Sequence, residues 1–536
     1  MDRQKAARLS VGLSLLVLVM YLWLPTKNHI PDGLGFAQSV EKATGLEPTL
    51  LDPNHLLYRA FGYSLYSVVQ SVEPSIRALE VLRITNSLLS ALCAYLLFHL
   101  LLASLGSLYW SGVLTALFAF SATWWKFSTD ANSYIPSVLL ILASFYFLLP
   151  GKRSRPLLVA VLHSAAMCFH QLAVFFFPVA VLGLLYQNGW LSWRRRGFVA
   201  LRYSVIAFAL TVSVFFTGFY LSRGTAEFRP FARWITSHSP EVSFSFDLAD
   251  SLFLSLQGHL RLFLGGRPSA FLATVSPFSV GMALLFLALL GLLGWRLRGS
   301  TGQLWPFLSA LKRQRYHPLF GLASTWIGVY VVFLFFWLPH NTFYRLYYLP
   351  AIILLVGVCL APGEAAPPAR GYRALLFVSA LAVFNLAFYI YPYSRVETNP
   401  PLAFALRMRQ VWDENALIYY ARWTSDNLIL SYFNPATTWK SLPPGGLATL
   451  DEQLPEAYTR GQTVWLDTTA SDLLFSGGAP ARAWLVRHAG GQAPYEPENQ
   501  KHHIRLLQIF PAPEPTPTPT PGSETGQTVG PPQRRR

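Results

Sequence analysis

Long apolar runs separated by short charged loops constrain this chain more than any other feature. Charged residues make up 13% of its 536 residues, whereas soluble proteins carry about 25%. A helix needs about 20 mostly apolar residues to cross a bilayer. The sequence therefore predicts a mainly α-helical, polytopic membrane domain with about eleven transmembrane helices. The predicted spans are residues 9–25, 84–105, 108–125, 134–150, 156–170, 172–187, 200–221, 271–295, 319–338, 346–362 and 373–391.

Basic residues predict the orientation of these spans. Lys and Arg concentrate in cytoplasmic loops. If the N-terminus is cytoplasmic, the basic clusters all fall inside, at residues 3–8, 152–155, 194–202, 296–315 and 370–373. The net charge of +16 then reflects membrane topology and does not indicate a nucleic-acid partner. The predicted outer segments are residues 26–83, 126–134, 222–270, 338–345 and everything from 392 onward.

The C-terminal part differs in composition from the apolar part. In residues 392–510 charges return, and strand-like runs at 416–421, 463–467 and 504–510 alternate with a helix-like run at 425–433. This pattern predicts a small extracytoplasmic α/β domain after a membrane domain at residues 1–391. Residues 511–536 are rich in Pro and Thr, which predicts a disordered tail.

Three acids lie at the predicted outer surface. Asp32 and Asp52 follow the first apolar run, and Asp130 lies in the turn "KFSTDANSY" between the third and fourth spans. Charged groups are costly in hydrocarbon, so acids gathered at one membrane level suggest a function. A half-shielded carboxylate has a raised pKa and can accept a proton from a hydroxyl. Asp32 and Asp130 are therefore candidate catalytic residues.

Each acid also has a structural interpretation. The tripeptide "PDG" around Asp32 is common in turns. Asp52 precedes Pro53, which is a standard arrangement at the start of a helix. Asp130 fits a turn that caps the helix opening near Tyr134. These alternatives remain open beside catalysis for Asp32 and Asp130, and beside substrate binding for Asp52.

Outer cations and histidines form the second group of candidates. Arginine donates two hydrogen bonds to phosphate, so Arg223 and Arg345 are candidate ligands of a lipid-linked phosphate. The alternative for Arg345 is a side chain that extends from the membrane to the interface. His55 and His170 are candidate substrate contacts, although a lone interfacial His is usually structural. A divalent metal on Asp32, Asp52 and His55 stays a minor option, because their spacing matches no strong ligand motif.

Several motifs resemble a known superfamily. They are "PDGLGFA" at residues 31–37, "DPNHLLY" at 52–58, "WWKFSTDANSYIPS" at 124–137 and "FYRLYYLPAIILL" at 343–355. Their order over residues 9–391 resembles the GT-C integral-membrane glycosyltransferases, whose branches include protein O-mannosyltransferases and aminoarabinose transferases of lipid A. The chain departs from the O-mannosyltransferase pattern, because Gly33 follows Asp32 where those enzymes have Asp-Glu. The acceptor is therefore not carried over.

The resemblance implies a reaction and a set of roles. A sugar would move from a polyprenyl-phosphate donor to an acceptor hydroxyl or amine on a lipid, glycan or protein outside the cytoplasmic membrane. Asp32 would deprotonate the acceptor, and one displacement would invert the anomeric carbon. Cations would stabilise the leaving phosphate. Candidate residues for this site are Asp32 and Asp130 in catalysis, and Asp52, His55, Tyr134, His170, Arg223 and Arg345 in substrate binding.

Two other functions remain as alternatives. A transporter or flippase of lipid-linked saccharide usually shows inverted repeats and polar or broken helices at mid-membrane, and the sequence shows neither. A non-catalytic membrane assembly protein would need no role for Asp32.

Overall fold

The chain forms two units in the computed structural model. The structure describes residues 3–149, 152–189, 191–237, 244, 246–298, 318–360, 368–442, 446–468, 479–489, 494–497 and 504–511. Contacts divide the chain between Ala403 and Phe404, and the two units are described separately below. The boundary predicted from sequence, near residue 392, stays a prediction.

The first unit contains the apolar helices. Six are long and apolar enough to cross a membrane: α1 (Arg3–Trp23), α4 (Ala78–Leu105), α10 (Trp193–Arg223), α14 (Pro277–Leu297), α16 (Pro318–Trp337) and the run Gly371–Tyr393, which includes most of α18 (Pro368–Asn385). Five apolar helices are shorter: α5 (Leu108–Ala119), α7 (Tyr134–Tyr146), α8 (Pro156–Phe169), the run Gln171–Gln187, which joins η3 (Gln171–Phe176) to α9 (Phe177–Gln187), and α17 (Leu349–Leu360). Every predicted apolar run is thus helical, and the polytopic helical fold is confirmed. The count of eleven crossings stays a prediction.

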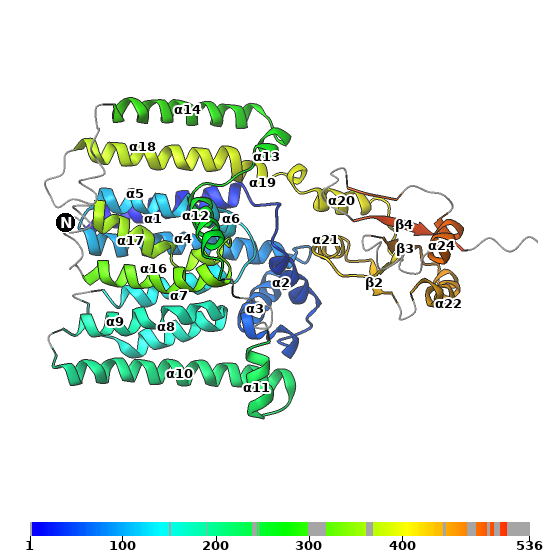
Figure 1. The fold of residues 1–536 in the computed structure, drawn as a ribbon, viewed down its shortest axis with the longest axis horizontal. Helices are drawn as coiled ribbons and strands as arrows, with labels where there is room; N and C mark the ends of the chain where they lie inside the picture. The colour runs from blue at the N-terminus through cyan, green and yellow to red at the C-terminus, as the bar shows by residue number, and fades with distance from the viewer. Residues whose placement is uncertain are drawn as a thin grey trace, which may run out of the picture. The chain divides into compact units, whose positions relative to one another are not determined.

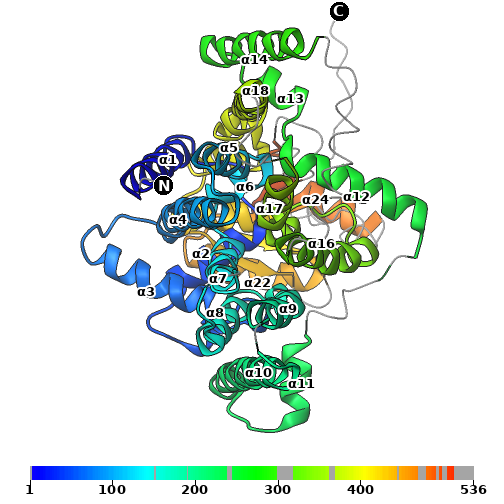
Figure 2. The ribbon, with the colours of Figure 1, turned by 90° about the vertical axis from the view of Figure 1, so that its left-hand side faces the viewer.

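The long helices run side by side, with α10 and α14 at opposite edges (Figures 1 and 2). The chain's N-terminus lies at one end of this bundle. At the other end, which we call the loop end, lie α2 (Pro31–Lys42), α3 (Tyr58–Gln70) and α11 (Phe228–Ile235). Buried aromatic side chains, among them Trp124, Trp125 and Trp326, fill the interior between the helices.

Two segments fold differently from the sequence prediction. The predicted span 108–125 is broken, because α5 ends at Ala119 and a separate α6 (Ala122–Ser128) follows it. The predicted outer loop 222–270 contains three helices: α11, α12 (Leu248–Phe263) and α13 (Pro268–Ala273). Helix α12 runs across the long helices (Figures 1 and 2). The remaining elements of this unit are η1 (Pro48–Leu50), η2 (Pro53–His55), η5 (Tyr344–Tyr347), η6 (Leu386–Ile390), α19 (Tyr391–Tyr393), η7 (Val396–Thr398) and α20 (Pro400–Met408), the last of which runs into the second unit.

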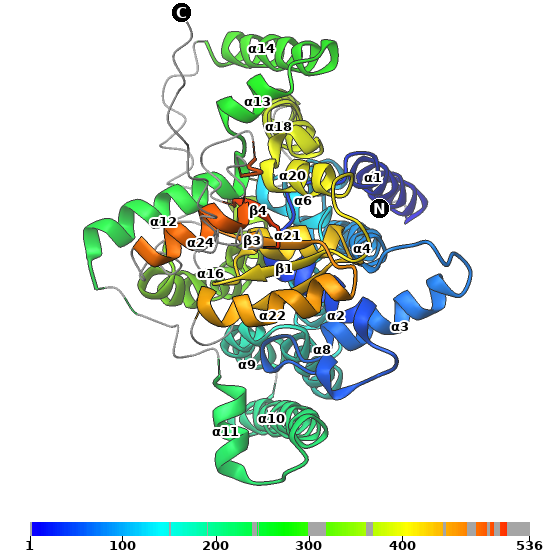
Figure 3. The ribbon, with the colours of Figure 1, turned by 90° about the vertical axis from the view of Figure 1, so that its right-hand side faces the viewer.

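The second unit is an α/β domain with a four-stranded sheet in the order β2-β1-β3-β4. Strands β1, β3 and β4 are labelled in Figure 3. Strands β2 and β3 pair parallel to β1, and β4 pairs antiparallel to β3. The predicted strands and helix are confirmed, and beyond Pro511 the predicted tail lies outside the described residues. The elements are β1 (Leu417–Tyr420), α21 (Ser425–Phe433), β2 (Thr438–Ser441), α22 (Leu447–Thr459), β3 (Val464–Asp467), α24 (Ala479–Ala489) and β4 (Leu506–Ile509).

Candidate functional site

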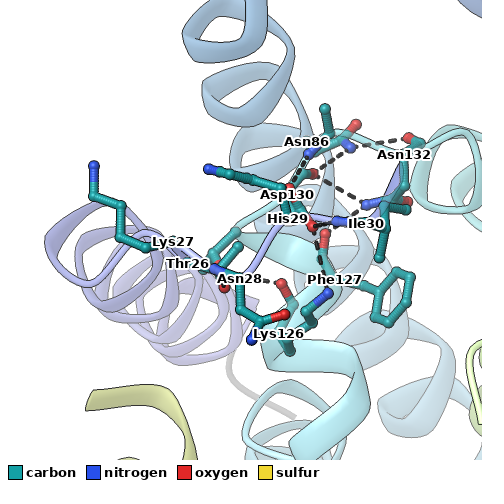
Figure 4. A network of polar contacts seen from close by, with 12 residues as sticks. Thr26, Lys27, Asn28, His29, Ile30, Asn86, Lys126, Phe127, Asp130 and Asn132 are labelled. Carbon is teal, nitrogen blue, oxygen red and sulfur yellow. Dashed lines mark hydrogen bonds and ion pairs between the residues drawn. The ribbon is translucent and has the colours of Figure 1, made fainter. Parts of the chain in front are cut away.

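Asp130 is the centre of a buried polar network at the loop end (Figure 4). Its Oδ1 accepts hydrogen bonds from the His29 Nδ1 (2.9 Å) and the Ala131 backbone N–H (3.0 Å). Its Oδ2 accepts the Ile30 backbone N–H (3.1 Å) and lies 3.4 Å from the Lys126 Nζ. The carboxylate therefore ties the segment after α1 to the turn after α6. We call these residues, with Asn86 and Asn132, the Asp130 network.

The charge state of this network follows from its contacts. Burial alone would raise the pKa of the Asp130 carboxyl, but Lys126 and the His29 and Ile30 hydrogen bonds outweigh burial and hold that pKa below its usual value. Burial lowers the pKa of Lys126, and the charge of Asp130 partly opposes the shift. We infer an ionised pair, with both side chains buried.

Two asparagines complete the Asp130 network. The Asn86 Nδ2, on α4, donates to the backbone carbonyls of Asp130 (2.8 Å) and Asn132 (2.9 Å). The Asn132 Oδ1 accepts the backbone N–H groups of Tyr134 and Ile135, both at 3.2 Å. Asn132 thus caps α7, so the capping role considered for Asp130 is wrong. An amide accepts these N–H groups as well as a carboxylate does and leaves Asp130 free to pair with Lys126.

Asp32 lies in the first turn of α2 and is exposed. Pro31 opens this helix, so "PDG" forms a helix start and not an isolated turn. A Cβ on Gly33 would lie 2.3 Å from the Ala131 carbonyl oxygen, which explains the glycine beside Asp32. Burial and then the Asp32 charge raise the pKa of Tyr344 to about 12. The charge of Asp32 therefore acts on Tyr344.

An aromatic cluster joins three predicted site residues. The His170 ring centroid lies 4.8 Å from that of His55 and 5.0 Å from that of Tyr134. Tyr134 in turn lies 5.9 Å from Tyr344, centroid to centroid. The His170 Nδ1 accepts the Leu172 backbone N–H at 3.1 Å, so we assign the neutral ring's proton to Nε2. The structure thus brings His55, Tyr134 and His170 together beside the Asp130 network.

Asp52 caps a short helix. Its Oδ1 accepts the Asn54 backbone N–H at 2.9 Å, at the start of η2, and its Oδ2 lies 3.5 Å from the Arg59 Nη2. The helix-start interpretation is confirmed. Within the described ranges, no group of three or more His, Cys, Asp or Glu side chains is arranged to hold a metal ion.

Arg345 is fully buried and is held by neutral groups. Its Nη2 donates to the Pro339 carbonyl (2.6 Å), and its Nη1 donates to the Tyr348 hydroxyl (2.6 Å) and lies 3.2 Å from the His259 Nδ1. Across the part of the chain that the structure describes, no acid forms an ion pair with Arg345, and its Nε has no hydrogen-bond partner. We call Arg345, Tyr348, His259 and Gly258 the Arg345 pocket.

Helix α12 forms one wall of the Arg345 pocket. A Cβ on Gly258 would lie 2.6 Å from the Arg345 Nε, so only glycine allows this helix to approach the guanidinium so closely. The Tyr348 hydroxyl and the His259 Nε2 are 3.0 Å apart. His259 therefore belongs to the same polar group as Arg345.

An apolar cavity of about 580 Å³ begins at His259. It lies between α5, α12, α14, α17 and α18, and His259 is the polar side chain among its lining residues. The lining residues are Leu117, His259, Leu260, Phe263, Leu264, Phe286, Leu290, Leu293, Val356, Phe377, Ala380, Leu381 and Phe384. A large apolar volume thus adjoins the Arg345 pocket.

Sequence reasoning missed several residues of this region and included one, Arg223, that has no polar contact with the other described candidates. Arg223 is exposed in the last turn of α10, with no ion pair or hydrogen bond to the other candidates in the described ranges. The candidate set omitted His29, Lys126, Asn86 and His259. Asn86 had a usable signal, because a polar residue inside an apolar span is rare. The contact between His259 and Arg345 had none, since the two are 86 residues apart.

Comparison with known proteins identifies the fold. No family model and no curated protein sequence matches the chain. Among solved structures, the chain is similar to ArnT from Cupriavidus metallidurans in the apo state, with a TM-score of 0.57 and 14% identity over 95% of this chain and 99% of that one. It is also similar to the same protein bound to undecaprenyl phosphate, with a TM-score of 0.54 and 12% identity over 95% of this chain and 98% of that one. The chain therefore shares the fold of ArnT, as the resemblance of the motifs predicted, and it is an integral membrane protein.

Proposed function

We propose that the chain is a glycosyltransferase that takes its sugar from a polyprenyl-phosphate carrier at the outer face of the cytoplasmic membrane. The observation that carries this proposal is the apolar cavity adjoining the Arg345 pocket. One of the similar ArnT structures holds undecaprenyl phosphate, which has the same two chemical parts, an apolar chain and a phosphate.

A lipid-linked phosphate fits these two neighbouring features. The cavity's lining would hold isoprene units of the carrier, and His259 would lie where the chain meets its phosphate. A buried cation is normally paired, because an isolated buried charge is costly. Arg345 is buried with neutral partners alone among the described residues. An incoming phosphate would supply the missing anion.

The reaction would be a single displacement. The acceptor oxygen or nitrogen attacks the anomeric carbon as the bond from that carbon to the phosphate oxygen breaks. Asp32 takes the acceptor's proton, and the polyprenyl phosphate leaves with its charge stabilised by Arg345. The charge of Asp32 acts on Tyr344, and Tyr344 precedes Arg345 in the chain. One short segment would therefore link the neighbourhood of the base to the phosphate ligand, and inversion would follow from the single displacement.

The other candidates take supporting roles in this proposal. Asp130 would position Lys126 and the segment that leads to Asp32, since its oxygens are already occupied by protein donors. His55, Tyr134 and His170 would border the sugar. Asp52 would act through the shape of η2, which it caps.

Transfer of label from a radiolabelled polyprenyl-phosphate sugar tests the proposal. Membranes containing the wild type, Asp32→Asn or Glu73→Gln are compared, the last being an exposed acid in the same predicted loop. We expect transfer by the wild type and the control and loss in Asp32→Asn. Equal transfer by all three removes Asp32 as the base. Movement of label across the bilayer without transfer would instead support a flippase, and neither transfer nor movement would support an assembly protein. A parallel assay with a chelator tests metal dependence.

A further inference from the structure

The corner between α10 and α11 carries an unbalanced positive charge, and we infer that it binds the phosphate of an anionic phospholipid. The corner consists of residues 220–235 and includes Arg223, Arg229 and Arg233. Glu227 is the one acid in this stretch, so three arginines and one glutamate give a net charge of +2. All three arginines are exposed.

The local fold sets the direction of these arginines. Helix α10 ends at Arg223, and the next residue, Gly224, has a φ of 66°, the left-handed value that glycine adopts without strain. Helix α11 then packs back on α10, with ring centroids 5.6 Å apart for Phe219 and Phe231 and 5.7 Å for Phe219 and Trp234. Arg229 and Arg233, four residues apart, share the opposite face of α11.

These arginines have no side-chain partner among the residues that the structure describes. Over the ranges that the structure describes, no side chain forms an ion pair or hydrogen bond with Arg223, Arg229 or Arg233. The corner also lies at the loop end, opposite the chain's N-terminus (Figure 1). In the predicted topology this end is outside, where the positive-inside bias disfavours arginine. A negatively charged partner accounts for three arginines kept there.

The apolar surroundings select a lipid as that partner. Tyr220, Leu221 and Phe228 are 52%, 56% and 75% exposed beside the arginines. Exposed apolar side chains continue along α10 at Phe208 and Val205. Acyl chains cover such a surface, aromatic rings prefer the level of the head groups, and arginines reach the phosphates above them. A soluble phosphate would leave the apolar part uncovered.

Native mass spectrometry of the full chain with phosphatidylglycerol tests this inference. The variant Arg223→Gln/Arg229→Gln/Arg233→Gln is compared with the wild type and with Arg407→Gln/Arg409→Gln/Arg422→Gln, which removes three arginines from the second unit. We expect binding to weaken about fivefold for each corner arginine lost, and not in the control. Phosphatidylcholine should bind more weakly to the wild type, and glycerol phosphate should not compete.

Equal retention of phosphatidylglycerol by the wild type and the corner variant would overturn the inference, as would an equal loss in the control. Competition by glycerol phosphate would also overturn it, because the site would then bind the phosphate without the lipid. If the triple variant unfolds, Arg229→Gln alone decides, since Arg229 is exposed on the face of α11 away from α10. The inference does not depend on sugar transfer and stands or falls separately from it.

Discussion

The Asp130 network and the Arg345 pocket both bury a cation at the loop end, and they differ in how that charge is balanced. Lys126 faces Asp130 at 3.4 Å, and the carboxylate is saturated by further donors. Arg345 meets a carbonyl, a hydroxyl and an imidazole, with no acid among the described residues. A balanced charge needs nothing more from outside the protein, whereas an unbalanced one is completed by an anion. The first region therefore belongs to the fold, and we propose that the second binds a ligand.

The comparison predicts its largest effect for Asp130→Asn. This change leaves Lys126 buried without its counter-charge, and breaking a buried pair costs about 3–5 kcal/mol. Thermal unfolding in detergent should show the loss. Because the pKa of Asp130 is held low, its contribution is present above about pH 4 and is lost as the pH falls through that lowered pKa.

The control for this prediction is the double variant Asp130→Asn/Lys126→Met. It removes both charges together, so it should recover most of the stability that Asp130→Asn loses. A double variant as unstable as the single one would mean that the carboxylate matters for its backbone contacts and not for the charge of Lys126.

Arg345→Met should show the opposite pattern, with a large loss of transfer and little loss of stability. Removing a group that stabilises charge in a transition state typically lowers the rate about 100- to 1,000-fold. An apolar side chain of similar length leaves no buried charge, so the folded state should tolerate it. Transfer rates from polyprenyl-phosphate sugar measure the first effect, and thermal unfolding the second.

The matched control is Arg261→Met, an exposed arginine on α12. We expect wild-type transfer from it. If Arg345→Met instead unfolds the protein, Arg345 belongs to the fold as Asp130 does, and the distinction between the two regions fails.

Sequence alone predicted the helical architecture because a membrane helix is marked by one continuous apolar run in the sequence. Each apolar run could be recognised by its own length and composition, and the strands at Leu417–Tyr420 and Val464–Asp467 by their short apolar patterns. The break after Ala119 was missed because residues 120–125 carry no charge and are mostly apolar, with Ser121 and Thr123 as the polar exceptions, so the apolar run continues across the break. Helices α11, α12 and α13 in the predicted outer loop 222–270 were missed because this loop contains no apolar run long enough to cross a membrane.

The candidate site was predictable only in part. Asp32, Tyr134 and Tyr344 belong to motifs with recognisable neighbours, and the structure does bring their segments together. Lys126 and Asp130 are four residues apart, a spacing typical of helical ion pairs, so that link could have been predicted. The contact of Arg345 with α12 depends on the packing of distant segments, which no local pattern encodes. Its full burial rules out the interpretation as a side chain reaching to the interface.

Gly33→Ala should lower stability by a different route, because it disturbs the Asp130 network without changing a charge. The new Cβ would lie 2.3 Å from the Ala131 carbonyl oxygen, and backbone shifts of this kind cost about 1–3 kcal/mol. Gly35→Ala is the matched control in the same helix, since its Cβ meets nothing within 4 Å. There we expect stability to rise by about 0.5–1 kcal/mol. Equal unfolding temperatures for the two variants would show that α2 does not pack tightly against the turn after Asp130.

Asp52 should give the smallest effect, because its shortest contact is with the backbone of η2 and its ion pair with Arg59 is long, at 3.5 Å. Asn caps a helix about as well as Asp does, so Asp52→Asn should leave the unfolding temperature nearly unchanged, while Asp52→Ala removes the bond to the Asn54 N–H and should cost about 1 kcal/mol. Transfer should follow the same order, with the Asn variant close to the wild type. A large loss of transfer in Asp52→Asn with unchanged stability would mean that the charge of Asp52 contacts a substrate. Asp52 would then be a substrate-binding residue, as we propose for Arg345.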